Sequence, residues 1–252
     1  MSSQSRPATE VKNVGKRFGS TRALADVSLD LQPGITALVG VNGAGKSTLL
    51  TTLAGALQPD EGQILVGGDD LYNNQRTRRR ALRRCALMPQ IPVFPKNLPA
   101  HEVVTYLCWM RGSSSRAASA RADEALADVG LSSKRDHKIG SLSGGMLRRV
   151  ALAQATASQP EVLLLDEPST GLDPRQRRSM VELLTSLPGA VLVSSHVMED
   201  VADLARRVLV LHEGTLRFDG DLHALSALAP DGTPPHRSLE AGFLSLLLRP
   251  GV

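Results

Sequence analysis

A strand, a glycine-rich turn and a helix start follow one another within residues 35–53, and this order constrains the fold more than any other feature. The run 35–39 is short, apolar and β-prone, which predicts a buried strand. The run 48–53 has the apolar spacing of a helix. Between them the chain reads GVNGAGKST, which fits the pattern G-x-x-x-x-G-K-[ST] of a phosphate-binding loop. We therefore favour nucleotide binding over a chance match, because the flanking strand and helix are the context that such a loop requires.

The chemistry of this loop follows from its residue types. Glycines allow positive φ angles and bring backbone N–H groups close to a ligand, where the helix dipole also favours a polyphosphate. A lysine in this position reaches the β- and γ-phosphates, and the following hydroxyl can bind Mg²⁺. The predicted nucleotide-binding residues are Gly40, Asn42, Gly43, Ala44, Gly45, Lys46, Ser47 and Thr48, with Ser47 also a predicted metal ligand.

Composition excludes several classes of protein. An apolar content of 42% with 21% charged residues is ordinary for a globular protein. No apolar run approaches the length of about 20 residues that spans a bilayer. Residues 1–7 are polar and lack an apolar signal core, so we expect a cytoplasmic location. Cys85 and Cys108 have no C-x-x-C spacing, which predicts neither a metal site nor a disulfide framework.

An arginine cluster lies at residues 76–84, ahead of a predicted strand. Such a cluster can contact nucleic acid or anionic head groups, or it can form one solvated face of a helix. Aromatic residues make up only 3% of the chain and none interleaves with the cluster, so no platform for base stacking is visible. We favour the solvated helix face and expect no nucleic acid partner.

The chain changes character along its length. Residues 10–35 alternate polar and apolar side chains, which predicts an antiparallel arm leading into the loop strand. A proline-rich opening after residue 91 gives way to helical patterns at 103–110 and 121–129, separated by a Ser/Gly linker at 112–115. We interpret residues 91–145, approximately, as an α-helical subdomain inserted into an α/β core.

Two further apolar runs, 161–166 and 189–194, are bounded by Pro and Gly, and each predicts a fully buried parallel strand. Residues 207–218 predict a hairpin, and residues 238–248 a short amphipathic helix after a proline-rich loop. We expect one domain over 8–226 and a short C-terminal extension over 227–252.

Two acids, Asp166 and Glu167, lie at the end of the apolar run 161–166. The carboxyl end of such a strand faces the ligand crevice of an α/β sheet. There Asp166 would hold Mg²⁺ through water, and Glu167 would act as general base toward an attacking water. The alternative is a pair of surface acids at a strand end. The phosphate-binding loop upstream favours the catalytic interpretation.

A serine and two glycines, Ser143, Gly144 and Gly145, open a predicted helix at 147–156. They form a second site rich in N–H groups, which suits an anion. Because one phosphate loop already serves this chain, we expect the second site to complete the nucleotide site of another subunit. The alternative is an ordinary serine N-cap with flexible glycines.

With these motifs in this order, the chain resembles an ATP-binding-cassette (ABC) ATPase, the nucleotide-binding subunit of ABC transporters, over roughly residues 10–220. Its Walker A motif matches 40–48, its signature matches Leu142–Met146 and its Walker B motif matches Val162–Asp166. The resemblance implies an α/β fold with a P-loop NTPase core, a mixed sheet flanked by helices, an N-terminal antiparallel β arm and the inserted helical subdomain. Met146 stands where the signature usually has Gln, and we expect activity to survive this departure.

The resemblance also implies roles for residues that are uninformative alone. Gln90 would bind Mg²⁺ or the attacking water and link the core to the insert, and His196 would contact the γ-phosphate. Phe18 would stack on adenine, although it could equally be a core aromatic. Asp173 could cap the helix that begins near Pro174, reach across a dimer interface, or do both. The implied catalytic set is Lys46, Gln90, Glu167 and His196, and the implied metal ligands are Ser47, Gln90 and Asp166.

By this resemblance, two subunits pack head to tail around two ATP molecules and Mg²⁺, and drive transport by a separate transmembrane permease. The subunit would lie on the inner face of the cell membrane, and the dimer could be homo- or heteromeric. The tail 238–244 looks like the end segment of bacterial export cassettes, which favours export. Two alternatives remain, a soluble ABC ATPase acting on nucleic acid or ribosomes and a non-hydrolysing regulatory cassette. The lack of long heptad arms argues against the first, and the intact Glu167 and His196 argue against the second.

Overall fold

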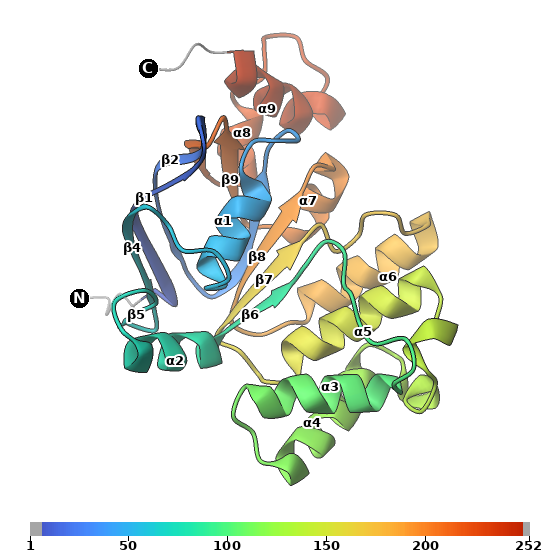
Figure 1. The fold of residues 1–252 in the computed structure, drawn as a ribbon. Coiled ribbons are helices and arrows are strands. Elements are labelled where there is room, and N and C mark those ends of the chain that lie inside the picture. Colours follow the sequence, from blue (N-terminus) through green and yellow to red (C-terminus); the bar gives the residue numbers. More distant parts are fainter. Residues whose placement is uncertain (1–6, 249–252) are drawn as a thin grey trace, which may run out of the picture.

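The strand that leads into the phosphate loop lies inside a six-stranded sheet of order β10-β9-β3-β8-β7-β6 (Figure 1). The structure, a computed structural model, describes residues 7–248. All neighbouring strands in this sheet run parallel except β10, which is antiparallel to β9. The strands are β3 (Gly34–Val39), β6 (Cys85–Met88), β7 (Val162–Asp166), β8 (Ala190–Ser195), β9 (Arg207–His212) and β10 (Thr215–Gly220).

Every residue of β7 and β8 is buried. Such strands occur where layers cover both faces of a parallel sheet, and their sequences then read as continuous apolar runs. Both strands lie within one residue of the runs at 161–166 and 189–194, and the 207–218 hairpin is formed by β9 and β10. The carboxyl ends of β3, β7 and β8 therefore meet at one edge of the sheet, which is where the loops of interest leave it.

A second, antiparallel sheet of order β2-β1-β4-β5 contains the N-terminal arm. The helix α1 (Lys46–Leu53) packs between this sheet and one face of the main sheet. Leu24, Leu50, Ile64 and Leu164 meet there in one buried cluster. The strands are β1 (Thr9–Phe18), β2 (Thr21–Leu31), β4 (Glu61–Val66) and β5 (Asp69–Asp70).

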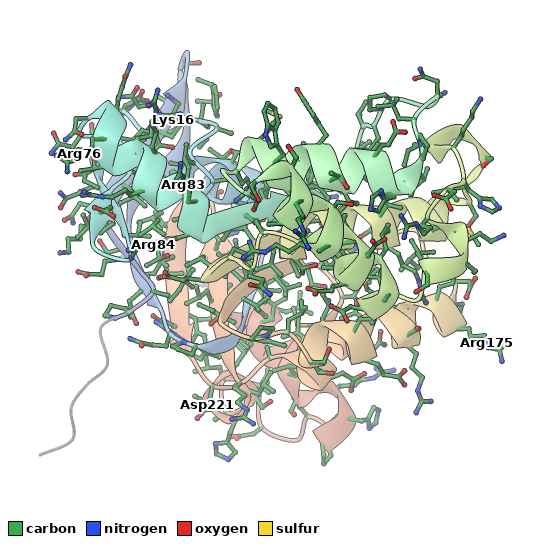
Figure 2. The ribbon with its side chains drawn as sticks, turned by 90° about the horizontal axis from the view of Figure 1, so that it is seen from below. Lys16, Arg76, Arg83, Arg84, Arg175 and Asp221 are labelled. Carbon is green, nitrogen blue, oxygen red and sulfur yellow. The ribbon has the colours of Figure 1, made fainter. Side chains whose placement is uncertain are left out.

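The arginine cluster lies on α2 (Gln75–Arg84), directly before β6, and Figure 2 shows Arg76, Arg83 and Arg84 along this helix. Several members bind their own surroundings. Arg78 donates to the carbonyl of Gly55 at 2.7 Å, Arg84 donates to the carbonyl of Gly67 at 3.0 Å, and Arg80 forms an ion pair with Asp69. Part of the cluster thus attaches α2 to the second sheet.

The helical segment consists of α3 (Ala100–Met110), α4 (Ser115–Asp128) and two short 3-10 turns at Ser132–Lys134 and Ile139–Ser141. The helix α4 begins six residues before the predicted pattern at 121–129, where Ser114 caps it by accepting from the N–H of Ala117. Its buried face is made of alanines, including Ala118 and Ala122. Alanine gives a weak apolar signal, and this explains why the predicted helical pattern begins later than the helix itself.

On the outer side of α3, three apolar side chains are exposed. Tyr106 is 55% exposed, Trp109 is 50% exposed and Met110 is 61% exposed, and the rings of Tyr106 and Trp109 lie 6.0 Å apart. The inner side of the same helix buries Val103, Val104 and Cys108 against the rest of the segment. This helix therefore has apolar side chains on both faces.

The remaining helices cover the other face of the main sheet. The helices α5 (Gly144–Thr156) and α6 (Pro174–Thr185) pack there with α3 and α4. The helices α7 (Met198–Leu204), α8 (Leu222–Ser226) and α9 (Ser238–Leu248) pack against β3 and β9, with a 3-10 turn at Pro235–Arg237 before α9. Within residues 7–248, no helix is long and apolar enough to cross a membrane.

Cys85 and Cys108 are both free and buried. Burial raises the pKa of the Cys85 thiol to about 12, so this thiol stays protonated.

Candidate nucleotide-binding and catalytic site

The phosphate loop connects β3 to α1 through glycines that no other residue could replace without strain. Gly43 has a φ of 84° and Gly45 a φ of 106°. A Cβ at Gly45 would lie 2.5 Å from the carbonyl oxygen of Ala23, and one at Gly40 would lie 2.4 Å from that of Leu211. Gly45 is also the N-cap of α1 and makes no side-chain cap bond. The first N–H groups of α1 therefore have no side-chain cap and suit an anion.

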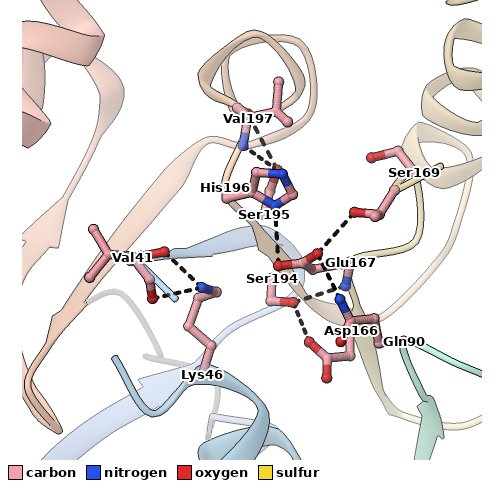
Figure 3. A network of polar contacts seen from close by, with 12 residues as sticks. Val41, Lys46, Gln90, Asp166, Glu167, Ser169, Ser194, Ser195, His196 and Val197 are labelled. Carbon is pink, nitrogen blue, oxygen red and sulfur yellow. Dashed lines mark hydrogen bonds and ion pairs between the residues drawn. The ribbon is translucent and has the colours of Figure 1, made fainter. Parts of the chain in front are cut away.

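A pocket of about 520 Å³ opens beside this loop, lined by residues 42–48 together with Gln90 and Glu167. Lys46 is 7% exposed, and its Nζ donates to the carbonyls of Gly40 at 2.7 Å and Val41 at 3.2 Å (Figure 3). Burial lowers the pKa of Lys46, while Glu167 and Asp166 oppose that shift. The loop thus presents a cation at the pocket wall opposite the two acids.

The acids at the end of β7 are fixed by the neighbouring strand β8. The hydroxyl of Ser194 donates to Oδ1 of Asp166 at 2.7 Å and accepts from the N–H of Glu167 at 2.9 Å. Glu167 has a left-handed backbone with a φ of 48°, which is uncommon for a residue with a side chain. This turn carries its carboxylate away from the strand direction and toward the pocket.

Three side chains from three different loops hold the carboxylate of Glu167. Its Oε2 accepts from Nε2 of Gln90 at 3.0 Å and from the hydroxyl of Thr170 at 2.9 Å, while its Oε1 lies 3.2 Å from Nδ1 of His196. Burial acts to raise the pKa of Glu167, but the Thr170 hydroxyl and His196 outweigh it, and the pKa lies below its ordinary value. Glu167 is therefore ionised at neutral pH, as a base toward water must be.

The contact with Glu167 restricts the proton positions of His196, whose side chain is half exposed. A neutral imidazole that donates from Nδ1 can only accept at Nε2. Donation from Nε2 to a phosphate then needs a protonated ring or release of Nδ1 from Glu167.

Two contacts of this site involve residues that sequence reasoning did not select. Thr170 is one, and Arg148 on α5 is the other, since its Nη1 lies 3.4 Å from the carbonyl of Gln90 and 3.3 Å from that of Glu167. Burial lowers the pKa of Arg148, and the charge of Glu167 opposes this. Thr170 lies in the segment 169–173 that resembles a motif of ABC ATPases, although sequence reasoning gave it no role, and Arg148 gives no sequence signal.

The second predicted anion site lies apart from the first. Ser143 and Gly145 line a different pocket of about 230 Å³, together with Met146 and Gln176. The Ser143 hydroxyl caps α5 by accepting from the N–H of Met146 at 3.3 Å. A single chain therefore does not bring the serine–glycine turn into the pocket of its own phosphate loop.

Asp173 and Phe18 also lie outside that pocket. Asp173 is exposed and caps α6, with its Oδ1 accepting from the N–H of Gln176 at 2.9 Å. Phe18 ends β1, is 51% exposed and has Nζ of Lys16 at 5.8 Å from its ring centroid. The pocket lining beyond β1 comes from Thr21, Arg22 and Ala23.

No group of three or more His, Cys, Asp or Glu that could hold a metal ion occurs within the described residues. A nucleotide-bound Mg²⁺ does not need such a group, because it takes only one or two protein ligands beside phosphate oxygens and waters. A hydroxyl at Ser47, in the wall of the pocket, and a buried carboxylate at Asp166 fit that mode.

A phosphate loop with its lysine, an acid at the end of a buried parallel strand and a second acid held at the pocket edge define a P-loop nucleoside triphosphatase. A model of the ABC transporter family matches residues 24–170, more than half of the chain. The Nod factor export ATP-binding protein I of Burkholderia lata is 38% identical over 220 residues, 86% of this chain and 71% of that protein. The chain belongs to the ABC transporter family.

Two solved structures are similar to this one. An ATP-binding subunit of an ABC transporter shares the fold, with a TM-score of 0.82 over 95% of this chain and 99% of that chain, at 24% identity. A dimeric ATP-binding cassette in a post-hydrolysis state, bound to ADP and phosphate, is 25% identical, with a TM-score of 0.75 over 85% of this chain and 98% of that chain. The predicted fold class and the prediction of an ATP-binding, ATP-hydrolysing transporter subunit are confirmed.

Proposed function

We propose that this chain hydrolyses ATP as half of a head-to-tail dimer and powers export by a separate transmembrane permease. One observation carries the catalytic part. The carboxylate of Glu167, ionised and buried, lies at the edge of the phosphate-loop pocket between Gln90, Thr170 and His196. A general base needs this combination of charge, direction and proximity to the reacting phosphate.

Each residue of the pocket then has a role. Lys46 exchanges its carbonyl partners for the β- and γ-phosphates, and Ser47 and Asp166 would hold Mg²⁺, which neutralises phosphate charge when it is bound. Glu167 accepts a proton from water that Gln90 orients. His196 leaves Glu167 and donates to the γ-phosphate, so the two partners of its ring are used in turn.

A second copy would supply the serine–glycine turn. Ser143, Gly144 and Gly145 lie in a separate pocket of the same chain and form the start of α5, whose N–H groups suit an anion. The dimeric relative bound to ADP and phosphate supports this arrangement. Asp173, exposed at the start of α6, would reach the partner chain, and Phe18, exposed at the end of β1, would stack on adenine. Both a homodimer and a heterodimer are compatible with this proposal.

The membrane partner would bind the groove around Gln90 and the helical insert. Large apolar side chains are exposed on this part of the chain, namely Ile91, Val93, Tyr106, Trp109 and Met110. Such side chains are typical of a protein interface. The subunit would then lie on the inner face of the cell membrane, and the Nod factor export relative supports the direction of transport. We assign the cassette to residues 8–226, with an extension at 227–252 of which the structure describes residues up to 248.

Copurification tests the proposal. Tagged Glu167→Gln protein is expressed in its native host and recovered from detergent-solubilised membranes, with Glu182→Gln as control because Glu182 is an exposed glutamate of α6. We expect a polytopic membrane protein to copurify with Glu167→Gln. Recovery of ribosomes or nuclease-sensitive nucleic acid instead would contradict the transport proposal and make the arginines of α2 the next residues to mutate.

A further inference from the structure

Two segments leave the carboxyl ends of β7 and β8 and carry the groups around Glu167. The first begins at Glu167, contains Thr170 and Asp173, and continues into α6. The second contains His196 and continues into α7. The hydroxyl of Ser194 connects the two segments where they leave the sheet. His196 and Glu167 meet just beyond that connection.

A second connection joins the two segments through α7. Asp200 on α7 is 4% exposed, its Oδ2 accepts from the hydroxyl of Ser169 at 2.5 Å, and its Oδ1 accepts from Nε of Arg177 at 2.6 Å. Ser169 opens the turn that ends at Asp173, and Arg177 donates its backbone N–H to the carbonyl of Asp173 at 2.9 Å. The Asp200 carboxylate therefore binds the first residue of the turn 169–173 directly, and it reaches the last residue through Arg177 of α6.

The tip of this turn is exposed to solvent. Gly171 and Asp173 are exposed, and Gly171 has a left-handed φ of 74°. The base of the turn, in contrast, is held by bonds to a buried charge, and short bonds to a charged group are the strongest hydrogen bonds in proteins. A rigid base with an exposed tip is suited to place that tip against another molecule.

We propose that Asp200 is a positioning residue for ATP hydrolysis, which fixes the turn 169–173 to the helix that follows His196. The two segments then change position together, so that movement of His196 from Glu167 toward the phosphate also moves the turn that carries Asp173. This inference rests on the proposed roles of Glu167 and His196. It assigns to Asp200 no contact with ATP, since Asp200 does not line the phosphate-loop pocket.

The substitution Asp200→Asn tests this in the purified full chain, together with its copurified membrane partner where activity requires it. The amide keeps the size of the side chain and removes its charge. We expect kcat to fall by about ten- to a hundredfold, because small misplacement of catalytic groups costs that much, while the dissociation constant for a fluorescent ATP analogue is unchanged. In the Glu167→Gln background, the ATP-driven dimer measured by size-exclusion chromatography is expected to weaken.

The control is Asp203→Asn, which makes the same change on the same helix at an exposed residue. A milder variant, Ser169→Ala, keeps the test available if Asp200→Asn does not fold. If Asp200 acts through Ser169, the double variant that combines Ser169→Ala with Asp200→Asn hydrolyses ATP no more slowly than Asp200→Asn alone. Asp200→Glu, which retains the carboxylate, is expected to recover part of kcat.

A merely structural carboxylate would give another result. Thermal stability would fall, kcat per folded molecule and ATP-driven dimerisation would match those of Asp203→Asn, and the inference would be overturned. Failure of the proposed function is recognised separately. Normal hydrolysis by Glu167→Gln would contradict the assignment of Glu167 as the base, and the comparison of Asp200→Asn with Asp203→Asn would still be valid.

Discussion

At the scale of single residues, the two oxygens of the Glu167 carboxylate accept from a glutamine, a threonine and a histidine. We expect Glu167→Gln to bind ATP with the affinity of the native chain and to lower kcat by a factor of about 10² to 10⁴, the usual contribution of a positioned base. Single-turnover hydrolysis beside equilibrium binding measures both quantities. Turnover at the native rate would contradict the assignment.

Thr170 provides a prediction about pH. Its hydroxyl contributes to the lowered pKa of Glu167, so Thr170→Val should raise that pKa and move the acid limb of the kcat profile to higher pH. The lowered pKa of Glu167 also makes the stability of the folded chain depend on pH. A pKa lowered by folding stabilises the native chain above the ordinary pKa of glutamate, about 4.3, and this contribution is lost as the pH falls. Thr170→Ser, which keeps the hydroxyl, is the control, and an unchanged acid limb in Thr170→Val would argue against this role.

Substitution of Lys46 is expected to act on ATP binding, unlike substitution of Glu167. Its ammonium group lies against two loop carbonyls, 2.7 and 3.2 Å away, and is positioned to exchange them for phosphate oxygens. Lys46→Ala should therefore weaken ATP binding itself, unlike Glu167→Gln. Calorimetric titration of both variants separates the two effects, and equal ATP affinity in Lys46→Ala and the native chain would argue against a phosphate contact.

At the scale of elements, sequence pattern predicts those pieces that are buried on both faces. The strands β3, β7 and β8 coincide with short, mainly apolar runs, and this pattern predicts their positions. The start of α4 is not predicted from its sequence pattern, because its buried face consists of alanines. Sequence reasoning gives Thr170 and Arg148 no role, since their contacts depend on how a turn and a helix approach Glu167 in space.

The cluster between α1 and the two sheets gives a prediction at this scale. Leu164 of β7 is fully buried there, and Leu164→Ala should lower the free energy of unfolding by about 2–5 kcal/mol through lost burial and a residual cavity. Chemical denaturation measures this. Leu244→Ala on α9, where the side chain is 48% exposed, is the control and should have a much smaller effect.

At the scale of the whole molecule, the separation of the two anion sites predicts complementation. In a head-to-tail pair, a chain with Lys46→Ala or a chain with Ser143→Arg has no intact composite site when it pairs with itself, but the mixed dimer contains one. Mixing equal amounts should restore about a quarter of the native ATPase rate, since half of the dimers are mixed and one of their two sites works. Absence of any recovery, with both chains folded and dimeric, would falsify the shared site.

The outer face of α3 has a consequence for spectroscopy. Trp109 is the chain's single tryptophan, and it is half exposed beside Tyr106. The tryptophan emission of the chain therefore reports from the helical segment alone, without any label. A partner that covers this helix would exclude water from the indole and shift the emission to shorter wavelength, whereas events confined to the phosphate loop would leave the spectrum largely in place.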